Sequence, residues 1–384
     1  MKSKCEHLNT SAFNLNNNIE KKDEAKLNKY KLTEDLIKND LKNLHLDIRN
    51  MFVTNRPELK EICDYYFDGS GKSIRPLIVC TLARVLNTHQ YLKLNNFSDT
   101  AQIDADKRKS LLLASQHQIA LITEMIHVAS LMHDDIIDNS DLRRGKTSVN
   151  SQWGCHKAVL AGDYVLSVAS RTLAQLGNVN AVEAFSTVLE DLVKGELMQF
   201  GTKENENERF EHYSTKTYRK TASLIANACK SVAHLLTENG GELQNKPSDK
   251  QADSELVSMA YECGKNVGVA FQLIDDVLDF TSHSDKLGKP GYGADLRLGL
   301  ATAPVLFAAA QFPELNTMIM RRFSKENDVL KAFEFVLKSD GIKETRFLAS
   351  KYCENAETIL NKLKPTEEAE YLKYLIKSII KREK

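Results

Sequence analysis

Residues 110–138 read SLLLASQHQIALITEMIHVASLMHDDIID, an apolar run without Gly or Pro that ends in three aspartates. Its length and composition predict a buried α-helix. Similar apolar-rich runs cover 157–176, 181–200, 219–237, 255–281 and 299–311, whereas alternating β patterns are scarce. The chain of 384 residues contains only 17 Gly and 7 Pro, and a chain with so few helix breakers favours long helices. The sequence therefore predicts an all-α fold with one domain.

We expect this domain to cover residues 31–384. Thr33 is the expected N-cap of its first helix, and polar intervals near 88–108 and 238–254 are predicted to be surface loops. Residues 1–30 are rich in Asn and Lys, and we expect them to be poorly structured. As a mitochondrial leader this segment gives a weak signal, because it lacks Arg. It also carries four acidic residues: Glu6, Glu20, Asp23 and Glu24.

The overall composition argues against several classes of protein. Lys and Arg total 52 and Asp and Glu also total 52, so the net charge is zero, unlike the basic surface of a nucleic-acid binder. No run of about 18 uncharged apolar residues occurs, so we predict no membrane-spanning helix. The seven cysteines form no Cys-x-x-Cys pair, and we expect reduced thiols and no structural zinc site.

Two acidic clusters follow apolar runs, in VASLMHDDIID (128–138) and VAFQLIDDVLDF (269–280). In each, the first and last carboxylates are four residues apart and share one helix face. Such carboxylates repel each other and lose hydration beside apolar groups. Oxygen ligands without His or Cys favour Mg²⁺, which is usually shared with substrate phosphates. One such motif is a weak signal, but two copies predict opposed clusters that hold a diphosphate. The clusters are Asp134, Asp135 and Asp138, and Asp275, Asp276 and Asp279.

A diphosphate pocket also needs cationic side chains, and two short stretches supply them. GSGKSIRP (69–76) combines basic residues with glycines that let the backbone approach a ligand, and DNSDLRRGKTS (138–148) places an Arg pair after the first cluster. Guanidinium groups suit phosphate because they offer planar, bidentate donors. A histidine lies two helical turns before the first cluster. In isolation these residues would be interpreted as solvated or core positions; beside the clusters they predict a phosphate pocket. They are Lys72, Arg75, His127, Arg143 and Arg144.

At these motifs the sequence resembles the all-trans polyprenyl diphosphate synthases, and is similar to their long-chain hexaprenyl and decaprenyl catalytic subunits. The resemblance runs from about residue 31 to the C-terminus. GSGKSIRP resembles the family's GGKxxRP, with Ser70 in place of the first glycine. The other matching stretches are EMIHVASLMHDDIIDNSDLRRG (124–145), KGELMQF (194–200), KTYRKTASLIA (216–226), FQLIDDVLDF (271–280) and the basic C-terminus (382–384). The resemblance implies a single-domain bundle of long antiparallel helices around a central cavity, the isoprenoid synthase type.

The matched stretch LGKPGYGADLRLGLATAPVLFA (287–308) departs from the family in one place. Lys289 and Asp295 are six residues apart, where the family usually has five, so one residue is inserted around Gly291–Gly293.

The resemblance also implies roles for individual residues. Isopentenyl diphosphate would be held by Lys72, Arg75, His127 and Arg144. Two or three Mg²⁺ ions on an allylic diphosphate would be coordinated by Asp134, Asp138, Asp275 and Asp279, supported by Asp135 and Asp276. That diphosphate would also contact Arg143, Lys220 and Lys289, while Thr221 and Gln272 would line the cationic intermediate.

The predicted product is long. Ala129 and Ser130 lie five and four residues before Asp134, where short-chain relatives place an aromatic floor; two small residues let the cavity continue. We expect head-to-tail condensation of isopentenyl diphosphate with an allylic prenyl diphosphate to C30 or longer, for a quinone side chain such as that of ubiquinone. The resemblance further implies a homodimer or a hetero-oligomer with a related subunit, a mitochondrial location, and peripheral membrane contact during product release.

Three alternatives remain open from the sequence. A short-chain farnesyl or geranylgeranyl diphosphate synthase would share the motifs, and small residues below the first cluster argue against it. A head-to-head or cyclising enzyme would lack the second diphosphate pocket. A non-catalytic partner subunit would have decayed aspartate clusters, and both clusters are intact here.

Overall fold

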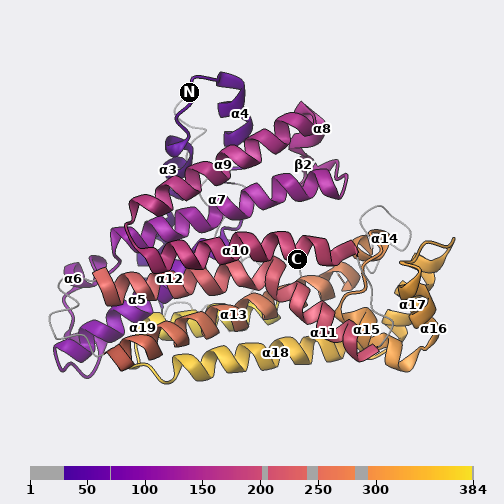
Figure 1. The fold of residues 1–384 in the computed structure, drawn as a ribbon. Coiled ribbons are helices and arrows are strands. Elements are labelled where there is room, and N and C mark those ends of the chain that lie inside the picture. The colour runs from indigo at the N-terminus through magenta and orange to yellow at the C-terminus, as the bar shows by residue number, and fades with distance from the viewer. Residues whose placement is uncertain (1–29, 70, 201–205, 240–249, 282–292, 383–384) are drawn as a thin grey trace. The chain divides into compact units, whose positions relative to one another are not determined.

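The described part of the chain is almost entirely helical (Figure 1). A computed structural model describes residues 30–69, 71–200, 206–239, 250–281 and 293–382. Within these ranges the only sheet is an antiparallel hairpin of β1 (Leu142–Arg143) and β2 (Lys146–Thr147). The predicted all-α fold is confirmed. The predicted unstructured segment, apart from Tyr30, lies outside the described residues.

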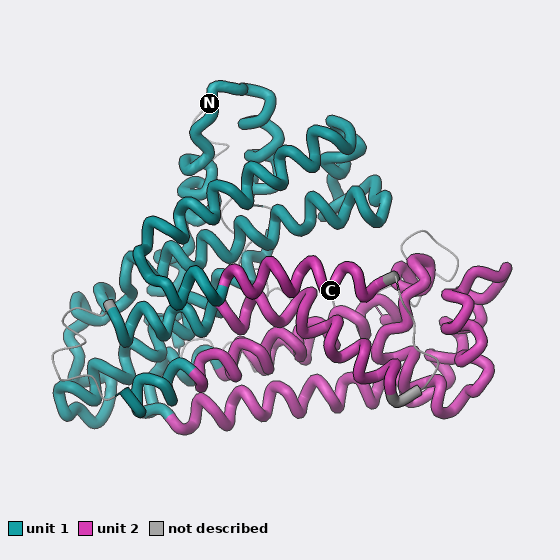
Figure 2. The backbone as a smooth tube through the Cα atoms, in the orientation of Figure 1, with its two compact units in different colours: residues 1–184, 228–257, 363–372 teal, residues 185–227, 258–362, 373–384 magenta. Residues whose placement is uncertain are grey.

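The chain divides into two compact units (Figure 2). Unit 1 comprises residues 1–184, 228–257 and 363–372, and unit 2 comprises residues 185–227, 258–362 and 373–384. Four helices contribute residues to both units: α10 (Val179–Leu197), α12 (Ser223–Asn239), α13 (Lys250–Thr281) and α19 (Glu367–Ile380).

The remaining elements belong to one unit each. Unit 1 contains the hairpin, α2 (Lys31–Leu41), α3 (Leu44–Met51), α4 (Pro57–Tyr65), α5 (Ile74–Leu94), η2 (Thr100–Gln102), α6 (Ala105–Lys109), α7 (Ala114–Ile137), α8 (Val149–Trp153) and α9 (Cys155–Gln175). Unit 2 contains η3 (Met198–Phe200), α11 (Glu206–Thr217), η4 (Tyr218–Ala222), α14 (Ala294–Arg297), α15 (Ala303–Gln311), α16 (Glu314–Met320), α17 (Asp328–Lys338) and α18 (Gly341–Leu360).

The two polar intervals contain more helix than the sequence suggested. Within 88–108, α5 continues to Leu94, and η2 and part of α6 follow. Leu92 is fully buried, so apolar contact extends the helix beyond the point where the sequence becomes polar. Within 238–254, α12 ends at Asn239 and α13 begins at Lys250; residues 240–249 lie outside the described part.

In unit 1, α7 packs against α5 and α9. Most of α7 is buried, which explains why its sequence is apolar on nearly every face. Gly162 lets α9 approach closely, because a Cβ there would lie 2.3 Å from Nε2 of His133 on α7. No helix in the described ranges is long and apolar enough to cross a membrane.

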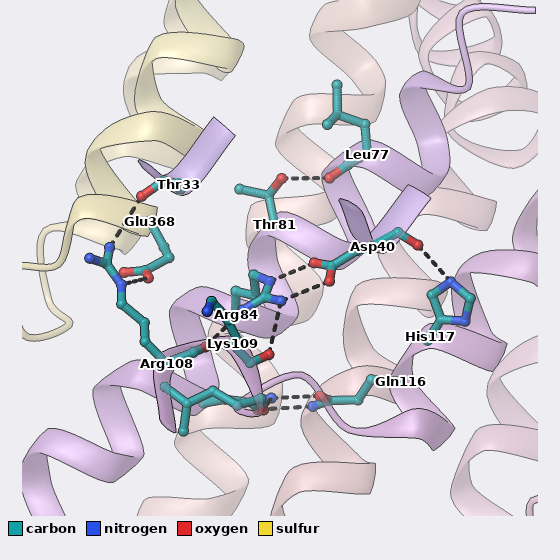
Figure 3. Close-up of polar contacts among 12 residues, drawn as sticks. Thr33, Asp40, Leu77, Thr81, Arg84, Arg108, Lys109, Gln116, His117 and Glu368 are labelled. Atoms are coloured by element: carbon teal, nitrogen blue, oxygen red, sulfur yellow. Dashed lines mark hydrogen bonds and ion pairs between the residues drawn. The ribbon is translucent and has the colours of Figure 1, made fainter. Parts of the chain in front are cut away.

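A buried polar network joins the N-terminal helices of unit 1 to α19 (Figure 3). Arg84 donates from Nε and Nη2 to the two carboxylate oxygens of Asp40, at 2.5 and 2.7 Å. Arg108 donates from Nε to Glu368 at 2.7 Å. Both guanidiniums are buried, so removal of Asp40 would leave the Arg84 charge uncompensated in the interior, whereas Arg108 would keep a second ion pair with Glu367 at 3.0 Å.

The core of unit 2 gathers around α15, which contacts α11, α16, α17 and α18. Phe280 and Phe333 are fully buried, with ring centroids 5.0 Å apart. Val305 and Leu315 belong to the same cluster. Phe280 follows the second aspartate cluster directly, so this core fixes the end of α13.

Candidate active site

The first aspartate cluster lies on a partly exposed stripe of α7. The stripe comprises His127, Ser130, Leu131 and Asp134, and their spacing of three or four residues places them on one helix face. The opposite face is buried and includes Val128, Ala129 and Met132. Asp138 caps the helix, and its backbone N–H donates to the Asp134 carbonyl at 2.8 Å.

Asp135, between these carboxylates in sequence, is fully buried. Its Oδ2 accepts the Tyr66 hydroxyl at 2.8 Å, and its Oδ1 accepts Arg143 Nε at 2.7 Å. Burial lowers the pKa of Arg143 less than its hydrogen bond and ion pair with Asp135 raise it, and the net shift is upward. The guanidinium that the sequence assigned to the allylic diphosphate therefore also holds the first cluster in place.

A tight hairpin brings Arg144 to the glycine-containing loop. Arg144 and Gly145 both have positive φ, 51° and 75°, as two-residue type I′ turns require. The Arg144 guanidinium lies against Gly71, where a Cβ would be 2.4 Å from Nη1. Gly71 directly precedes Lys72, whose side chain is exposed. These two predicted phosphate-binding residues therefore belong to one part of unit 1.

Two other predicted phosphate-binding residues, Arg75 and His127, are in contact with each other: Arg75 Nη1 lies 3.0 Å from His127 Nε2. A guanidinium only donates, so Nε2 is the acceptor and the ring proton resides on Nδ1. Burial, followed by the charges of Arg75 and Arg144, lowers the pKa of His127 well below its usual value. The ring is therefore neutral, and its N–H can donate to an anion.

The structure adds two residues of unit 1 that the sequence analysis missed. Nε2 of His45, on α3, lies 3.0 Å from Oγ of Ser73, whose φ of 44° is left-handed. Burial, followed by the charge of Arg144, lowers the pKa of His45 to about 4. Glu124 is buried one turn before His127, and burial raises its pKa. Only the spacing of Glu124 from His127 gave any signal in the sequence.

The second aspartate cluster has the same arrangement on α13. Asp275 and Asp279 are partly exposed, and Asp276 is buried. Asp276 Oδ2 accepts the Tyr213 hydroxyl at 2.5 Å, and its Oδ1 accepts Gln272 Nε2 at 2.8 Å. Burial raises the pKa of Asp276, which the two hydrogen bonds counteract in part.

Gln272 connects this cluster to a π-helical turn, η4. Thr221 Oγ1 donates to Gln272 Oε1 at 2.7 Å. Two glycines let neighbouring helices approach η4: a Cβ at Gly268 would lie 2.7 Å from Ala222 Cα, and one at Gly195 would lie 3.1 Å from the backbone N of Lys220. π-turns inside helices occur frequently at functional sites.

Charged groups surround the second cluster within unit 2. Lys220 Nζ pairs with Glu196 at 2.6 Å. Arg382, near the C-terminus, donates from Nη1 to Asp275 at 2.8 Å. Asp279 accepts the backbone N–H groups of Ala294 and Asp295, at 3.0 and 3.3 Å.

The sequence analysis gave no role to two further titratable residues of unit 2. Burial raises the pKa of Asp295, and the charges of Asp276 and Asp279 raise it further. Burial lowers the pKa of Lys216, against the opposite effect of Asp276. Both residues lie in stretches that matched the family; Asp295 was named only for its distance from Lys289, and Lys216 had no distinguishing spacing.

Most of the predicted site residues lie within the described part of the chain. Unit 1 holds Lys72, Arg75, His127, Ala129, Ser130, Asp134, Asp135, Asp138, Arg143 and Arg144; unit 2 holds Lys220, Thr221, Gln272, Asp275, Asp276 and Asp279. Ser70, Lys289 and residues 383–384 lie outside the described part. Among the described residues, no group of three or more His, Cys, Asp or Glu side chains is close enough to hold a metal ion alone.

The sequence is similar to known long-chain synthases. All trans-polyprenyl-diphosphate synthase PDSS1 of Homo sapiens is 51% identical over 345 residues, which cover 90% of this chain and 76% of that protein. The probable hexaprenyl pyrophosphate synthase, mitochondrial, of Neurospora crassa is 40% identical, covering 91% and 81%. Decaprenyl-diphosphate synthase subunit 1 of Schizosaccharomyces pombe is 38% identical, covering 91% of each.

A solved structure and a family profile also match this chain. The crystal structure of a polyprenyl synthase from Caulobacter crescentus, complexed with calcium and isoprenyl diphosphate, has a TM-score of 0.73 and 25% identity, covering 92% of this chain and 98% of that chain. Residues 56–336 match the profile of the polyprenyl synthetase family. The predicted resemblance is confirmed, and the chain belongs to the polyprenyl synthetase family.

Proposed function

We propose that this protein condenses isopentenyl diphosphate head-to-tail with an allylic prenyl diphosphate to make an all-trans product of C30 or longer. The observation that carries the proposal is the repeated arrangement of the two clusters: each presents two partly exposed carboxylates beside cationic side chains, while the carboxylate between them is buried. The high identity to long-chain synthases over 90% of the chain supports the long product.

The donor sets fit magnesium. Partly exposed carboxylates four residues apart supply hard oxygen ligands, and Mg²⁺ is commonly bound by one or two carboxylates together with substrate phosphates. The residues that would hold two or three ions are Asp134, Asp138, Asp275 and Asp279. When bound, the ions stabilise the negative charge that develops on the departing diphosphate.

The side chains of unit 1 would bind isopentenyl diphosphate. Arg75 and Arg144 supply positive charge, and His127 supplies a neutral N–H donor because Arg75 occupies its Nε2. Lys72, in the loop beside Arg144, is exposed and can reach a ligand from solvent. Charge-assisted hydrogen bonds of this kind are the strong ones in phosphate recognition.

The side chains of unit 2 would act on the allylic substrate. Lys220, and Lys289 outside the described part, would contact the allylic diphosphate together with Arg143. Thr221 and Gln272 are already hydrogen-bonded to each other, and their dipoles would line the allylic cation without reorganisation. The released diphosphate would accept the proton that the condensed carbocation loses as the new double bond forms.

Product length and cell location complete the proposal. Ser130 on the α7 stripe and Ala129 on the buried face beside it are both small, so no aromatic floor would stop a long product at this point. Such a product would be the side chain of a quinone such as ubiquinone. We place the protein in mitochondria, in line with the name of the Neurospora relative, with membrane contact at product release. The subunit numbering of the Schizosaccharomyces relative supports a hetero-oligomer, with a homodimer as the alternative.

A radiochemical assay tests this function. Purified protein receives farnesyl diphosphate, labelled isopentenyl diphosphate and Mg²⁺, and the products are separated by length. We expect C30 or longer chains, their loss with a chelator, and turnover at least roughly 100-fold lower in Asp134→Asn and Asp275→Asn, since even outer partners of a metal site contribute about 10- to 100-fold. Asp163→Asn, at an exposed position of α9, is the matched control. No elongation beyond C20, or chelator-resistant turnover, would contradict the proposal.

A further inference from the structure

Two buried tyrosines make equivalent contacts in the two units. Tyr66, which directly follows α4, and Tyr213, on α11, each retain 5% of their surface exposure. Tyr66 donates to Asp135 at 2.8 Å, and Tyr213 donates to Asp276 at 2.5 Å. In both cases the acceptor is the second aspartate of its cluster.

The second oxygen of each of these aspartates is also bonded within the protein. Asp135 receives Arg143 Nε at 2.7 Å, and Asp276 receives Gln272 Nε2 at 2.8 Å. Each carboxylate therefore directs both oxygens toward protein donors, whereas the outer carboxylates of the clusters are partly exposed. Burial, rather than the number of protein partners, separates the two anchoring aspartates from the outer ones, since Asp279 also accepts two backbone N–H groups.

Each tyrosine keeps its hydroxyl proton and donates it to its aspartate. Burial raises the pKa of both phenols, and the negative charge of the adjacent aspartate raises it further. The hydroxyls therefore keep their protons throughout the working pH range of an enzyme. A permanent donor to a buried carboxylate fixes its rotamer and removes the cost of an unsatisfied charge.

We propose that Tyr66 and Tyr213 are positioning residues for the two metal sites. Each holds the second aspartate of a cluster away from the metal and thereby sets the orientation of the outer carboxylates on the same helix turn. The inference rests on the proposed function, because it assumes that the outer aspartates bind divalent ions.

The two tyrosine–aspartate pairs, which we call the first anchor (Tyr66–Asp135) and the second anchor (Tyr213–Asp276), are hydrogen-bonded to different parts of the protein. Tyr66 also accepts the backbone N–H of Val149 at 3.3 Å, so the first anchor ties α7 to α8. The second anchor continues through Gln272 to Thr221, so it ties the metal site to the turn that would line the allylic cation. Loss of the second hydroxyl should therefore reduce kcat as well as metal affinity, whereas loss of the first should act mainly on metal affinity.

The test compares Tyr66→Phe and Tyr213→Phe with two control variants. Tyr65→Phe removes a hydroxyl that donates to the Thr147 carbonyl at 2.9 Å, and Tyr261→Phe removes one that lies 2.6 Å from the Tyr218 hydroxyl. For each full-length variant, three quantities are measured: the Mn²⁺ affinity with farnesyl thiodiphosphate as an unreactive probe, the Mg²⁺ concentration for half-maximal turnover, and the melting temperature.

In both anchor variants we expect the Mn²⁺ affinity to fall roughly 10- to 100-fold and the Mg²⁺ concentration for half-maximal turnover to rise by a similar factor, as for other outer partners of metal sites. Both controls should remain within about twofold of the wild type. A fall in melting temperature with unchanged Mn²⁺ affinity would overturn the inference and leave a structural role only. If one anchor variant does not fold, the other tests the inference alone. A wild-type protein that binds Mn²⁺ but does not elongate prenyl chains would refute the proposed function and not the anchors.

Discussion

Gly268→Ala tests how closely α13 must pack against the π-turn. A Cβ at Gly268 would lie 2.7 Å from Ala222 Cα and 2.9 Å from Ala222 Cβ. Both belong to a fully buried residue, so no flexible side chain can move aside. Ordinary contact begins at 3.4 Å, so the two segments must separate by about 0.7 Å.

That separation acts directly on the predicted cation-lining pair. Gln272 lies one turn after Gly268, and Thr221 precedes Ala222, so their 2.7 Å hydrogen bond crosses the same contact. If this oxygen–oxygen distance grows by about 0.7 Å, it approaches the longest distance at which a hydrogen bond forms. We expect the variant to lose about 1–3 kcal/mol of unfolding free energy through overpacking. The loss of about 1 kcal/mol for the hydrogen bond would lower kcat about fivefold.

The assay measures urea unfolding and steady-state kinetics for three variants. Gly195→Ala meets η4 less closely, at 3.1 Å, and should show a smaller effect of the same sign. Ser258→Ala, on an exposed position of α13, should leave both quantities unchanged. The KM for isopentenyl diphosphate should stay constant in all three, because its proposed residues lie in unit 1. Wild-type kcat and stability in Gly268→Ala would refute the packing argument.

Two further predictions concern product length and pH. Ser130→Phe should shorten the product, because Ser130 is partly exposed on the α7 stripe; Ala129→Phe should also shorten it but cost about 1–3 kcal/mol of stability, because Ala129 is fully buried. Chromatography of the products checks both predictions. If both variants make prenyl products as long as those of the wild type, these positions do not set the depth of the cavity. His89 Nδ1 accepts the Lys364 N–H at 2.9 Å, and burial lowers the pKa of His89 to about 4, from 6.5 in the unfolded chain. The stability from this neutral ring is complete above pH 6.5 and is lost as the pH falls through 4, by up to about 3 kcal/mol. Urea unfolding between pH 7 and 4 should show a shallower pH dependence in His89→Asn, and an unchanged dependence would contradict the assignment.

The sequence predicted the layout of the two clusters because that layout depends on helix periodicity alone. A spacing of four residues places Asp134 and Asp138, like Asp275 and Asp279, on one face. The structure shows these outer carboxylates partly exposed in both units. The positions of the long helices were also predictable from local sequence, because long apolar runs with few Gly or Pro residues mark them.

The partners of the clusters could not be predicted, because they are distant in the sequence. Tyr66 is 69 residues from Asp135, and Tyr213 is 63 residues from Asp276. A buried tyrosine that anchors a carboxylate has the same local sequence as one that fills a core. The π-turn also left no signal, since residues 218–222 continue a helical pattern and differ only in hydrogen bonding.

Counting bound metal ions tests the central claim most directly. Purified protein is titrated with Mn²⁺ in the presence of farnesyl thiodiphosphate, and the bound ions are counted by electron paramagnetic resonance. The account predicts about two or three ions per chain, and fewer in Asp134→Asn and in Asp275→Asn when each is measured separately. No bound Mn²⁺, or the same number in both variants as in the wild type, would contradict the claim that both aspartate clusters hold the diphosphate through divalent ions.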